Sequence, residues 1–396
     1  MNRILRFLLL LAASAAARDI HVGTDKDMPT IAHAIKAALP GDVIHLEPRV
    51  YRDYAGFYGK KGEPGKPITL DGHGAILEGS DTLNPAQWTE VSPGLFKNEA
   101  LLPRLDDAVI GRWFFLWGGQ MNHMGRTSKG RSAPLKKPED LQPGEWTFVK
   151  DPSRAKPSSL QIYGDFYLRL PAGQKLADAQ IFAPVRSAGV QMGGDNAHLV
   201  IKNLTATHPY NDGFNIHGDC RDVVFENIAA IECGDDGISA HESAQYRVDG
   251  FLSIGNSTGI TDTGTAQTSY TNVFLARNIG FDLFFLDEGR YTLTNAFVLS
   301  SAQNGLSITG RANGDCRMKM ENVLLRRLVK PHTGSVAARA ALEAKNCTFE
   351  NMEIKVEGSA HWDNCLINGR PFPEGAPATG ADASALMKLM PKDFKP

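Results

Sequence analysis

An Asn residue recurs at near-regular intervals through the second half of this 396-residue chain, within or just before a short apolar run. Asn and Gly both tolerate left-handed backbone, so their recurrence at one phase predicts a recurring bend. Asn side chains at successive bends can also hydrogen-bond to one another along the stack. The recurring positions are Asn203, Asn227, Gly250, Asn272, Asn295, Asn322 and Asn351, at steps of 24, 23, 22, 23, 27 and 29 residues.

The segments between these bends have the pattern of short strands. Apolar residues alternate over a few positions in HLVIKNL, DVVFENI, RVDGFLSI, NVFLARNI and LTNAFVLS, which favours strands over helices. Many short strands at a spacing of 22–24 residues indicate a β-solenoid. With three strands per coil, a coil being one complete winding, this period fits a right-handed parallel β-helix. We therefore expect an all-β fold of that class.

The N-terminus predicts export. Arg3 and Arg6 precede an apolar run and then small residues, which is the pattern of a signal peptide over residues 1–17. We expect an exported protein, periplasmic or extracellular. No later segment approaches the ~20 apolar residues of a membrane-spanning helix. A formal net charge of −2 gives no indication of a nucleic-acid partner.

The rest of the chain divides by its periodicity. An amphipathic helix is predicted at about 28–38, where it would cover the open N-terminal end of the solenoid. A long internal segment breaks the repeat and is expected to form a β-rich insertion packed against the coils. The expected segments are 18–95 (cap and first coils), 96–188 (insertion), 189–370 (main coils) and 371–396 (C-terminal tail).

The aromatic residues of the insertion and the cysteines can be explained by structural roles alone. Trp113 and Trp117 of the insertion are either platforms on which sugars stack or part of the insertion's own core. The five cysteines, an odd number, include no Cys-x-x-Cys pair that would suggest zinc. We expect most of them to be small apolar core residues.

Two acidic segments repeat one pattern. NDGFNIHG (211–218) and CGDDGISAHE (233–242) place Asp212 and Asp236, and likewise His217 and His241, 24 residues apart. If that spacing is one coil, equivalent residues lie side by side on strands about 4.8 Å apart. Asp212, Asp235 and Asp236 would then crowd one small patch together with the two imidazoles. Crowded like charges are costly, and catalysis is a leading reason for them.

The alternative to a catalytic site is a ladder of turns, in which each Asp only stabilises a tight bend at its own coil. Asp–Gly is ordinary turn chemistry, and Asp side chains often accept backbone N–H groups in tight bends. Non-catalytic β-helices would show such pairs for the same reason.

The acidic segments resemble the polygalacturonase family of β-helix glycoside hydrolases. That family carries an Asn-x-Asp-Gly motif at the start of one strand and a Gly-Asp-Asp motif one coil later. Asp212 matches the first motif, with one residue missing after Asn211, and Asp235 and Asp236 match the second. The resemblance implies that these three carboxylates surround the glycosidic bond, where one protonates the leaving oxygen and the others activate a water.

General chemistry supports a catalytic role for the three Asp residues independently of the family resemblance. Glycoside cleavage needs a protonated acid and an ionised carboxylate on either side of the bond. Three neighbouring carboxylates cannot all ionise cheaply, so one of them is expected to hold a proton near neutral pH. Asp236 is our candidate for the acid, with Asp235 and Asp212 holding the water.

Two elements of the family's pattern are missing. GNSTGIT (255–261) lacks the His of the family's Gly-His-Gly motif, about one coil further on. The later Arg-x-Lys motif, which binds a uronic carboxylate, has no counterpart, and DEGR (287–290) is the nearest basic element. The resemblance thus implies a carbohydrate-active β-helix without implying pectin as the substrate.

Further polar residues are predicted to bind the substrate. If Phe214, Ile216, Ile238 and Ala240 point inward on alternating strands, their neighbours point outward. Asp282 is expected on the same polar face. The predicted substrate-binding set is Asn215, His217, His241, Glu242, Asp262, Asp287 and Arg290. The outward imidazoles could bind sugar hydroxyls, donate a proton or ligate a metal.

One later strand is irregular. In FDLFFLDEGR (281–290), Phe284 and Phe285 cannot both point inward on a regular strand. Either one of them is an exposed platform for a sugar, or the strand contains a bulge.

Three functions fit these features. The first is a glycoside hydrolase acting on a polysaccharide or oligosaccharide, without a metal or cofactor. The second is a polysaccharide lyase, in which Asp235, Asp236 and Glu242 could hold Ca²⁺. No clear Lys or Arg falls in the patch, which favours hydrolysis. The third is a non-catalytic carbohydrate-binding surface protein, and the fold alone does not separate the three.

Overall fold

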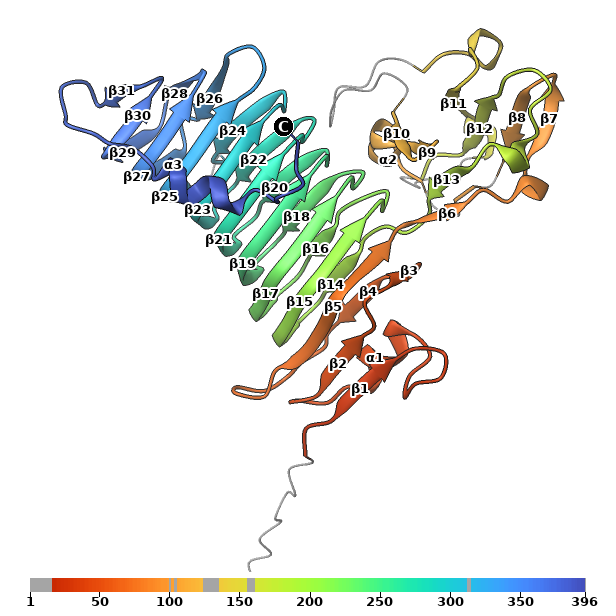
Figure 1. Ribbon diagram of the computed structural model, residues 1–396, viewed down its shortest axis with the longest axis horizontal. Coiled ribbons are helices and arrows are strands. Elements are labelled where there is room, and N and C mark those ends of the chain that lie inside the picture. The colour runs from red at the N-terminus through yellow and green to blue at the C-terminus, as the bar shows by residue number, and fades with distance from the viewer. Residues whose placement is uncertain are drawn as a thin grey trace, which may run out of the picture.

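The computed structural model describes residues 16–99, 101–102, 105–123, 135–154, 161–311 and 315–395. Its main body is a solenoid of parallel strands whose coils are stacked in sequence order (Figure 1). All but the last two residues of the predicted signal peptide lie outside the described residues, so export stays a prediction.

One of two sheets that run along the solenoid, the short-strand sheet, is built from strands of three to six residues. Every pairing in it is parallel. In spatial order its strands are β4 (Ala55–Tyr58), β14 (Val190–Gly193), β16 (Phe214–Ile216), β18 (Asp236–Ala240), β20 (Thr258–Asp262), β22 (Phe281–Leu286), β24 (Asn304–Thr309), β26 (His332–Val336) and β28 (Met352–Val356).

The other sheet, the long-strand sheet, is parallel except for a hairpin at its C-terminal end. Its main path is β1 (Asp19–Val22), β2 (Val43–Leu46), β5 (Ile68–Glu78), β15 (Ala197–Thr207), β17 (Arg221–Ile231), β19 (Gln245–Ile254), β21 (Gln267–Ala276), β23 (Arg290–Ser300), β25 (Cys316–Arg327), β27 (Ala340–Glu350), β30 (Cys365–Ile367) and β31 (Arg370–Phe372). Off this path, β3 (Val50–Tyr51) pairs with β5, and β29 (Ser359–Asp363) pairs with β27.

The predicted bends lie in the middle of the long strands. Asn203 and Asn227 have φ of 54° and 50°, and Gly250 occupies the same position with φ of 81°. The side chains form the expected ladder: Asn227 Nδ2 donates to Asn203 Oδ1 at 3.0 Å. Since Gly250 has no side chain, Asn272 donates to Asp249 instead, at 2.7 Å. Each long strand is thus divided into two arms, which gives a coil three straight segments.

The last predicted bend is wrong. The residue aligned with Asn322 is Asn346, because Glu321 pairs with Lys345 and Val323 pairs with Cys347. Asn346 has φ of 51°, and Asn364 donates to it at 2.7 Å. Asn351 lies beyond the end of β27, where it donates to the carbonyl of Val329. The ladder therefore keeps a step of 24 residues at this point.

Glycines at the start of the short strands explain part of the Asp–Gly pattern. A Cβ on Gly213 would lie 2.8 Å from the carbonyl oxygen of Gly237, and one on Gly237 would lie 2.7 Å from that of Gly259. Any larger side chain would collide with the next coil, so these glycines have a structural role. This contact does not explain why Asp212 and Asp236 precede these glycines.

The solenoid core is a single apolar cluster that runs from the first coils to the last. Phe214, Ile216, Ile238 and Ala240 are all fully buried in it, as the alternation predicted. Helix α1 (Ile31–Ala37) lies at the N-terminal end of the solenoid and contributes Ile31, Ala34 and Ile35 to the same core (Figure 1).

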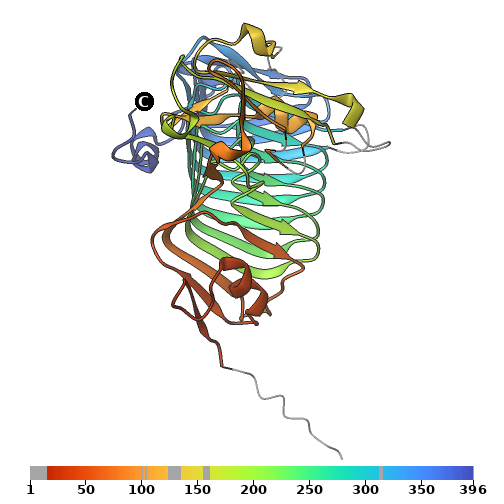
Figure 2. The ribbon, with the colours of Figure 1, turned by 90° about the vertical axis from the view of Figure 1, so that its right-hand side faces the viewer.

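The insertion forms two small antiparallel sheets with a separate core. The insertion begins before residue 96, the position at which the repeat was expected to break. Its first strand, β6, already pairs with β13 of the insertion. Its elements are β6 (Ser80–Thr82), β7 (Thr89–Ser92), β8 (Leu95–Asn98), α2 (Asp107–Arg112), β9 (Phe115–Trp117), β10 (Gln120–Asn122), β11 (Glu145–Lys150), β12 (Gly164–Arg169) and β13 (Ile181–Pro184). Figure 2 shows the insertion lying across one side of the solenoid.

Aromatic residues fill the insertion's core. Trp113 is fully buried there against Phe115 and Phe166, and Trp117 packs against the same cluster. The core explanation therefore holds for Trp113, which offers no surface to a sugar.

The C-terminal tail returns to the solenoid. Helix α3 (Ala383–Leu386) buries Leu386 against Phe274, Phe297 and Leu324, on the outside of the long-strand sheet. All five cysteines are buried thiols, as expected of core residues. Among the described residues, no helix has the length and apolarity to cross a membrane.

Candidate active site

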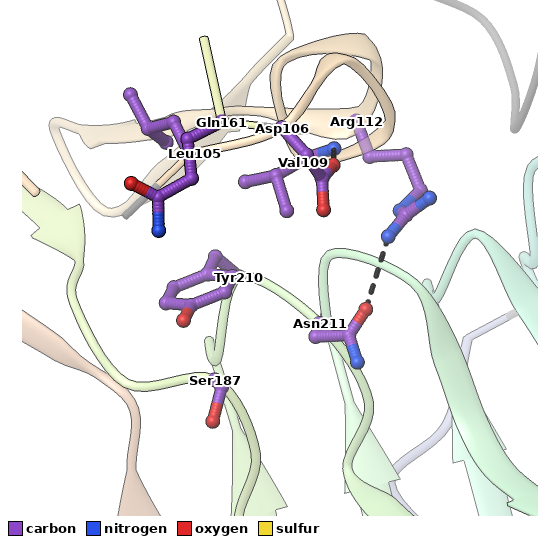
Figure 3. Close-up of a pocket in the computed structure, with 8 residues that line it drawn as sticks. All are labelled: Leu105, Asp106, Val109, Arg112, Gln161, Ser187, Tyr210 and Asn211. Atoms are coloured by element: carbon purple, nitrogen blue, oxygen red, sulfur yellow. Dashed lines mark hydrogen bonds between the residues drawn. The ribbon is translucent and has the colours of Figure 1, made fainter. Parts of the chain in front are cut away.

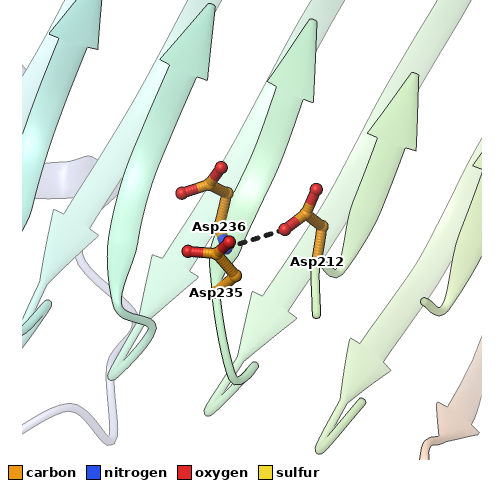
Figure 4. Close-up of side chains that lie close together, drawn as sticks. All are labelled: Asp212, Asp235 and Asp236. Atoms are coloured by element: carbon orange, nitrogen blue, oxygen red, sulfur yellow. Dashed lines mark hydrogen bonds between the residues drawn. The ribbon is translucent and has the colours of Figure 1, made fainter. Parts of the chain in front are cut away.

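The three predicted catalytic carboxylates lie together on adjacent coils. Asp212 lies two residues before β16, Asp235 and Asp236 lie where β18 begins, and these two strands are paired in register. One oxygen from each carboxylate lies within 4.8 Å of the other two (Figure 4). Their exposed fractions are only 2%, 6% and 3%. The 24-residue spacing is thus one coil, and it produces a buried acidic cluster.

Asp212 accepts hydrogen bonds on both of its oxygens. The backbone N–H of Asp236 donates to Oδ1 at 3.0 Å, and the hydroxyl of Ser239 donates to Oδ2 at 2.7 Å. Donors on both oxygens favour the ionised form of a carboxylate. The hydroxyl of Thr261 donates to Oδ1 of Asp236 at 3.0 Å.

A cation from the insertion reaches the cluster. Arg112, the last residue of α2, places Nη2 2.9 Å from Oδ2 of Asp235, and both side chains are largely buried. A guanidinium at this distance favours the ionised form of Asp235. The expectation that no Arg or Lys falls in the patch is therefore wrong.

A cavity of about 390 Å³ adjoins this ion pair. Figure 3 shows it between the insertion and the coils, with Arg112 bridging to Asn211 at 3.0 Å. It is of the size and mixed lining found in small-molecule sites. Its walls are Leu105, Asp106, Val109, Arg112 and Gln161 from the insertion, and Ser187, Tyr210 and Asn211 from the coils.

The two predicted imidazoles form a stack. The rings of His217 and His241 are parallel within 3°, with centroids 4.0 Å apart. Nε2 of His241 lies 3.2 Å from Oγ of Ser239, which itself donates to Asp212. A chain of contacts therefore links the imidazole stack to the carboxylates through Ser239.

Asn215 belongs to the same outward ladder. It donates to Gln191 at 3.1 Å on the preceding coil, and its Oδ1 lies 3.3 Å from the hydroxyl of Ser239 on the next coil. Asn215 is thus positioned beside the cluster, and its side chain orders Ser239.

Glu242 and Asp287 have a structural function at the opposite end of the short strands. Glu242 accepts the N–H of Gly218 at 2.8 Å, and Asp287 accepts that of Gly264 at 2.9 Å. Burial raises the pKa of Glu242, but the Gly218 N–H and His217 outweigh it and lower the pKa overall. Six residues of extended chain, roughly 20 Å, separate Glu242 from Asp236. The predicted Ca²⁺ set of Asp235, Asp236 and Glu242 is therefore not assembled, and Asp212 is the third carboxylate instead.

Asp262 was predicted on the substrate face, and this prediction is wrong. Its side chain points into the coil and accepts hydrogen bonds from the hydroxyls of Tyr246, Tyr270 and Thr268. Burial raises its pKa to about 7, against the opposing effect of these donors. Asp282 is also fully buried in the interior, where it accepts from Asn278 at 3.0 Å.

Arg290 is likewise not at the cluster. It is exposed at the start of β23 in the long-strand sheet, beyond the bend that follows Asp287. Asp287 is paired with Arg311 rather than with Arg290.

The irregular Phe pair is explained by the direction of each ring. From Leu283 to Phe285, β22 stays in register with β20 and β24, and these three residues alternate between inside and outside. Asp282 is buried next to Leu283, so the alternation does not extend to the start of the strand. Phe285 is fully buried in the core, while Phe284 points outward and stacks on Phe281. Phe284 is therefore the ring of this pair that lies outside the core.

Known proteins share this fold. No family model and no curated protein matches the chain. A solved structure described as a glycoside hydrolase superposes with a TM-score of 0.53 at 9% identity, over 88% of this chain and 97% of its own. A complex of XylC with xylose gives 0.49 at 11% identity (85% and 70% covered), and the Yersinia enterocolitica family 28 exopolygalacturonase gives 0.27 at 14% (90% and 80%). At 9% identity the similarity to the first of these structures is one of fold, and it agrees with the parallel β-solenoid.

The cluster has the parts that acid–base chemistry requires. Asp212 and Asp235 are held by groups that favour ionisation, and the third carboxyl group, Asp236, accepts a hydrogen bond from Thr261. The same three oxygens are also spaced so that they could hold a hard cation. The spacing of the two acidic segments did not reveal the contacts of Arg112, Thr261 and Ser239 with the carboxylates.

Proposed function

We propose that this protein is an exported glycoside hydrolase that cleaves a polysaccharide or oligosaccharide on the outer face of the short-strand sheet. The observation that carries the proposal is the buried cluster of Asp212, Asp235 and Asp236 with Arg112 against it. Burying three neighbouring acidic groups costs free energy, and such arrangements concentrate at functional sites. The fold shared with a glycoside hydrolase is compatible with this function without establishing it.

The roles follow from the hydrogen bonds. Asp236 is the general acid: it gives its proton to the glycosidic oxygen as the bond from that oxygen to the anomeric carbon breaks. Asp212 and Asp235, both favoured as carboxylates, hold a water, and one of them takes its proton as the water oxygen bonds to the anomeric carbon. The products are a new reducing end and an alcohol, and no metal or cofactor takes part.

The cavity beside Arg112 is proposed to bind the sugar on one side of the cleaved bond. Tyr210 offers a ring face, and Gln161 and Asn211 offer amide groups that suit sugar hydroxyls. His241, linked to the cluster through Ser239, lies further along the same face. We also propose right-handed winding of the solenoid, with α1 as its N-terminal cap.

A lyase is the second candidate, and two observations favour it. Arg112 is a cation at the cluster, and the three carboxylate oxygens could bind Ca²⁺, which together could neutralise a uronic acid for β-elimination. Against it, the same Arg112 is already engaged by Asp235.

Product analysis separates the two candidates. The purified chain is incubated with a panel of neutral and uronic polysaccharides, with and without EDTA. A hydrolase releases new reducing ends without ultraviolet absorbance of an unsaturated uronate, and EDTA leaves its rate unchanged. Unsaturated products and loss of activity with EDTA would establish the lyase. Binding without any cleavage would leave a carbohydrate-binding protein and contradict both.

A further inference from the structure

Two phenyl rings stack on one another at the outer face of β22, which leaves the outer side of the stack as an aromatic surface. The rings of Phe281 and Phe284 are stacked with centroids 4.3 Å apart and an angle of 13° between their planes. Both side chains remain partly exposed, unlike the fully buried Phe285 of the same strand.

The backbone explains why both rings face outward. Asp282 and Leu283, between them, are both fully buried in the interior, so the two positions that flank this pair are turned to the outside. Asp282 is held inside by Asn278, which donates to it at 3.0 Å. The rings are therefore fixed in place by the strand that carries them.

The aromatic surface lies in line with the carboxylates. Asp236 pairs with Thr258, and Thr258 pairs with Phe281, so the two sites occupy the same position on strands two coils apart. At about 4.8 Å per coil, this separation is roughly 10 Å. Thr261, which contacts Asp236, pairs with Phe284 in the same way.

The surroundings of the rings supply polar groups. Phe281 pairs with Asn304, and Phe284 pairs with Ser307, on the next coil. Between the rings and the acid, Thr258 is fully buried, and its hydroxyl has no hydrogen-bond partner in the described part of the chain. A buried hydroxyl without a partner is costly unless something supplies one.

We propose that Phe281 and Phe284 form a subsite for a neutral sugar unit of the substrate, about two coils from the point of cleavage. An aromatic face buries the C–H face of a sugar ring, while flanking hydroxyl and amide groups meet its hydroxyls. The face of a phenyl ring is electrically negative, so it disfavours a uronic carboxylate placed over it. This inference rests on the proposed function, since the cleavage point is defined by the carboxylates.

Kinetics and binding test the subsite together. Phe281→Ala, Phe284→Ala and the double variant are assayed on the neutral polysaccharide that the wild type cleaves fastest. Truncation should raise KM about three- to tenfold for each ring and leave the melting temperature nearly unchanged, as expected for aromatic contacts. Phe372→Ala is the matched control, because Phe372 is an exposed ring that packs edge-on against Trp362 at the C-terminal end of the solenoid.

Binding is measured without turnover, so that failure of the proposed function stays distinguishable. The Asp236→Asn protein, with and without the double Phe substitution, is run in gels that contain xylan, galactan, glucomannan or polygalacturonate. We expect the Phe substitutions to reduce retardation by at least one neutral polysaccharide and to leave polygalacturonate gels unaffected. Equal mobility in all neutral gels, or an effect confined to polygalacturonate, would overturn the inference, whether or not the enzyme cleaves any of them.

Discussion

Nη2 of Arg112 lies 2.9 Å from Oδ2 of Asp235, an ion pair that joins the insertion to the acidic cluster of the coils. The same nitrogen donates to Asn211, which lies next to Asp212 in the chain. The insertion therefore does more than pack against the solenoid, because it supplies the counter-charge of a proposed catalytic group. Two parts of the chain with separate cores meet at this one site.

Arg112→Ala should lower kcat by about 100-fold or more, since it removes a buried charge aimed at the reacting groups. Arg112→Lys should recover only part of the rate, because the Lys side chain is one bond shorter and its ammonium does not reach Asn211 and Asp235 from the same position. Steady-state rates and melting curves are the measurements. Arg186→Ala is the control: it removes the ion pair with Asp81 near the start of the insertion without touching the cluster. Equal rates in both Ala variants would contradict this account of Arg112.

Ser239→Ala should lower kcat with little change in KM. The hydroxyl of Ser239 donates to Asp212 and also contacts His241. Its loss removes a hydrogen bond that stabilises the Asp212 carboxylate and a contact that positions the imidazole. A loss of one such hydrogen bond to a charged group is worth about 1.5–3 kcal/mol, or roughly 10- to 150-fold in rate. Ser335→Ala, at the same outward position four coils further on, should keep the wild-type rate.

Asp262→Asn should change stability rather than catalysis. The folded-state pKa of Asp262 is raised to about 7 by burial, whereas an unfolded Asp ionises near 3.9. As the pH rises from about 4 to 7 the unfolded chain loses this proton and the folded one keeps it, so the free energy of unfolding falls. The fall from this group is at most about 4 kcal/mol, and it is complete once the pH exceeds the folded pKa.

Denaturant titrations between pH 4 and 8 measure this effect. The Asn variant should show a flatter dependence over that window and keep the wild-type kcat at neutral pH. A large loss of kcat in a folded Asp262→Asn protein would restore Asp262 to the site and contradict its interior position.

The repeat itself was predictable because a single residue sets each bend. Asn and Gly adopt left-handed backbone at little energetic cost. Their recurrence at one phase therefore predicts the length of a coil without knowledge of tertiary contacts. The exception, Asn351 in place of Asn346, arose because both are Asn residues with positive φ near the same strand. Only strand register distinguishes them.

The cluster followed from the spacing, but Asp262 was predicted on the outer face against its own phase. Asp262 lies opposite Ala240, an inward position, so phase alone indicated the interior. A carboxyl group inside an apolar coil is tolerable only because Tyr246 and Tyr270 donate to it. Those hydroxyls come from the other sheet, and a pattern along one strand does not reveal them.

The position of Arg112 could not be predicted from the repeat. The insertion does not share the repeat, so no spacing relates Arg112 to Asp235. Its position depends on how α2 and the small sheets pack on the coils, which is a tertiary property.

The most direct test replaces each proposed catalytic carboxylate in turn. Asp212→Asn, Asp235→Asn and Asp236→Asn are compared with the wild type by release of reducing ends from the best substrate of the panel and by melting temperature. We predict that each variant folds and that kcat falls by about 100-fold or more, as expected when a general acid or base is lost. Wild-type rates in the Asp236→Asn protein, or unfolding of all three variants, would show instead that the cluster is a ladder of turns.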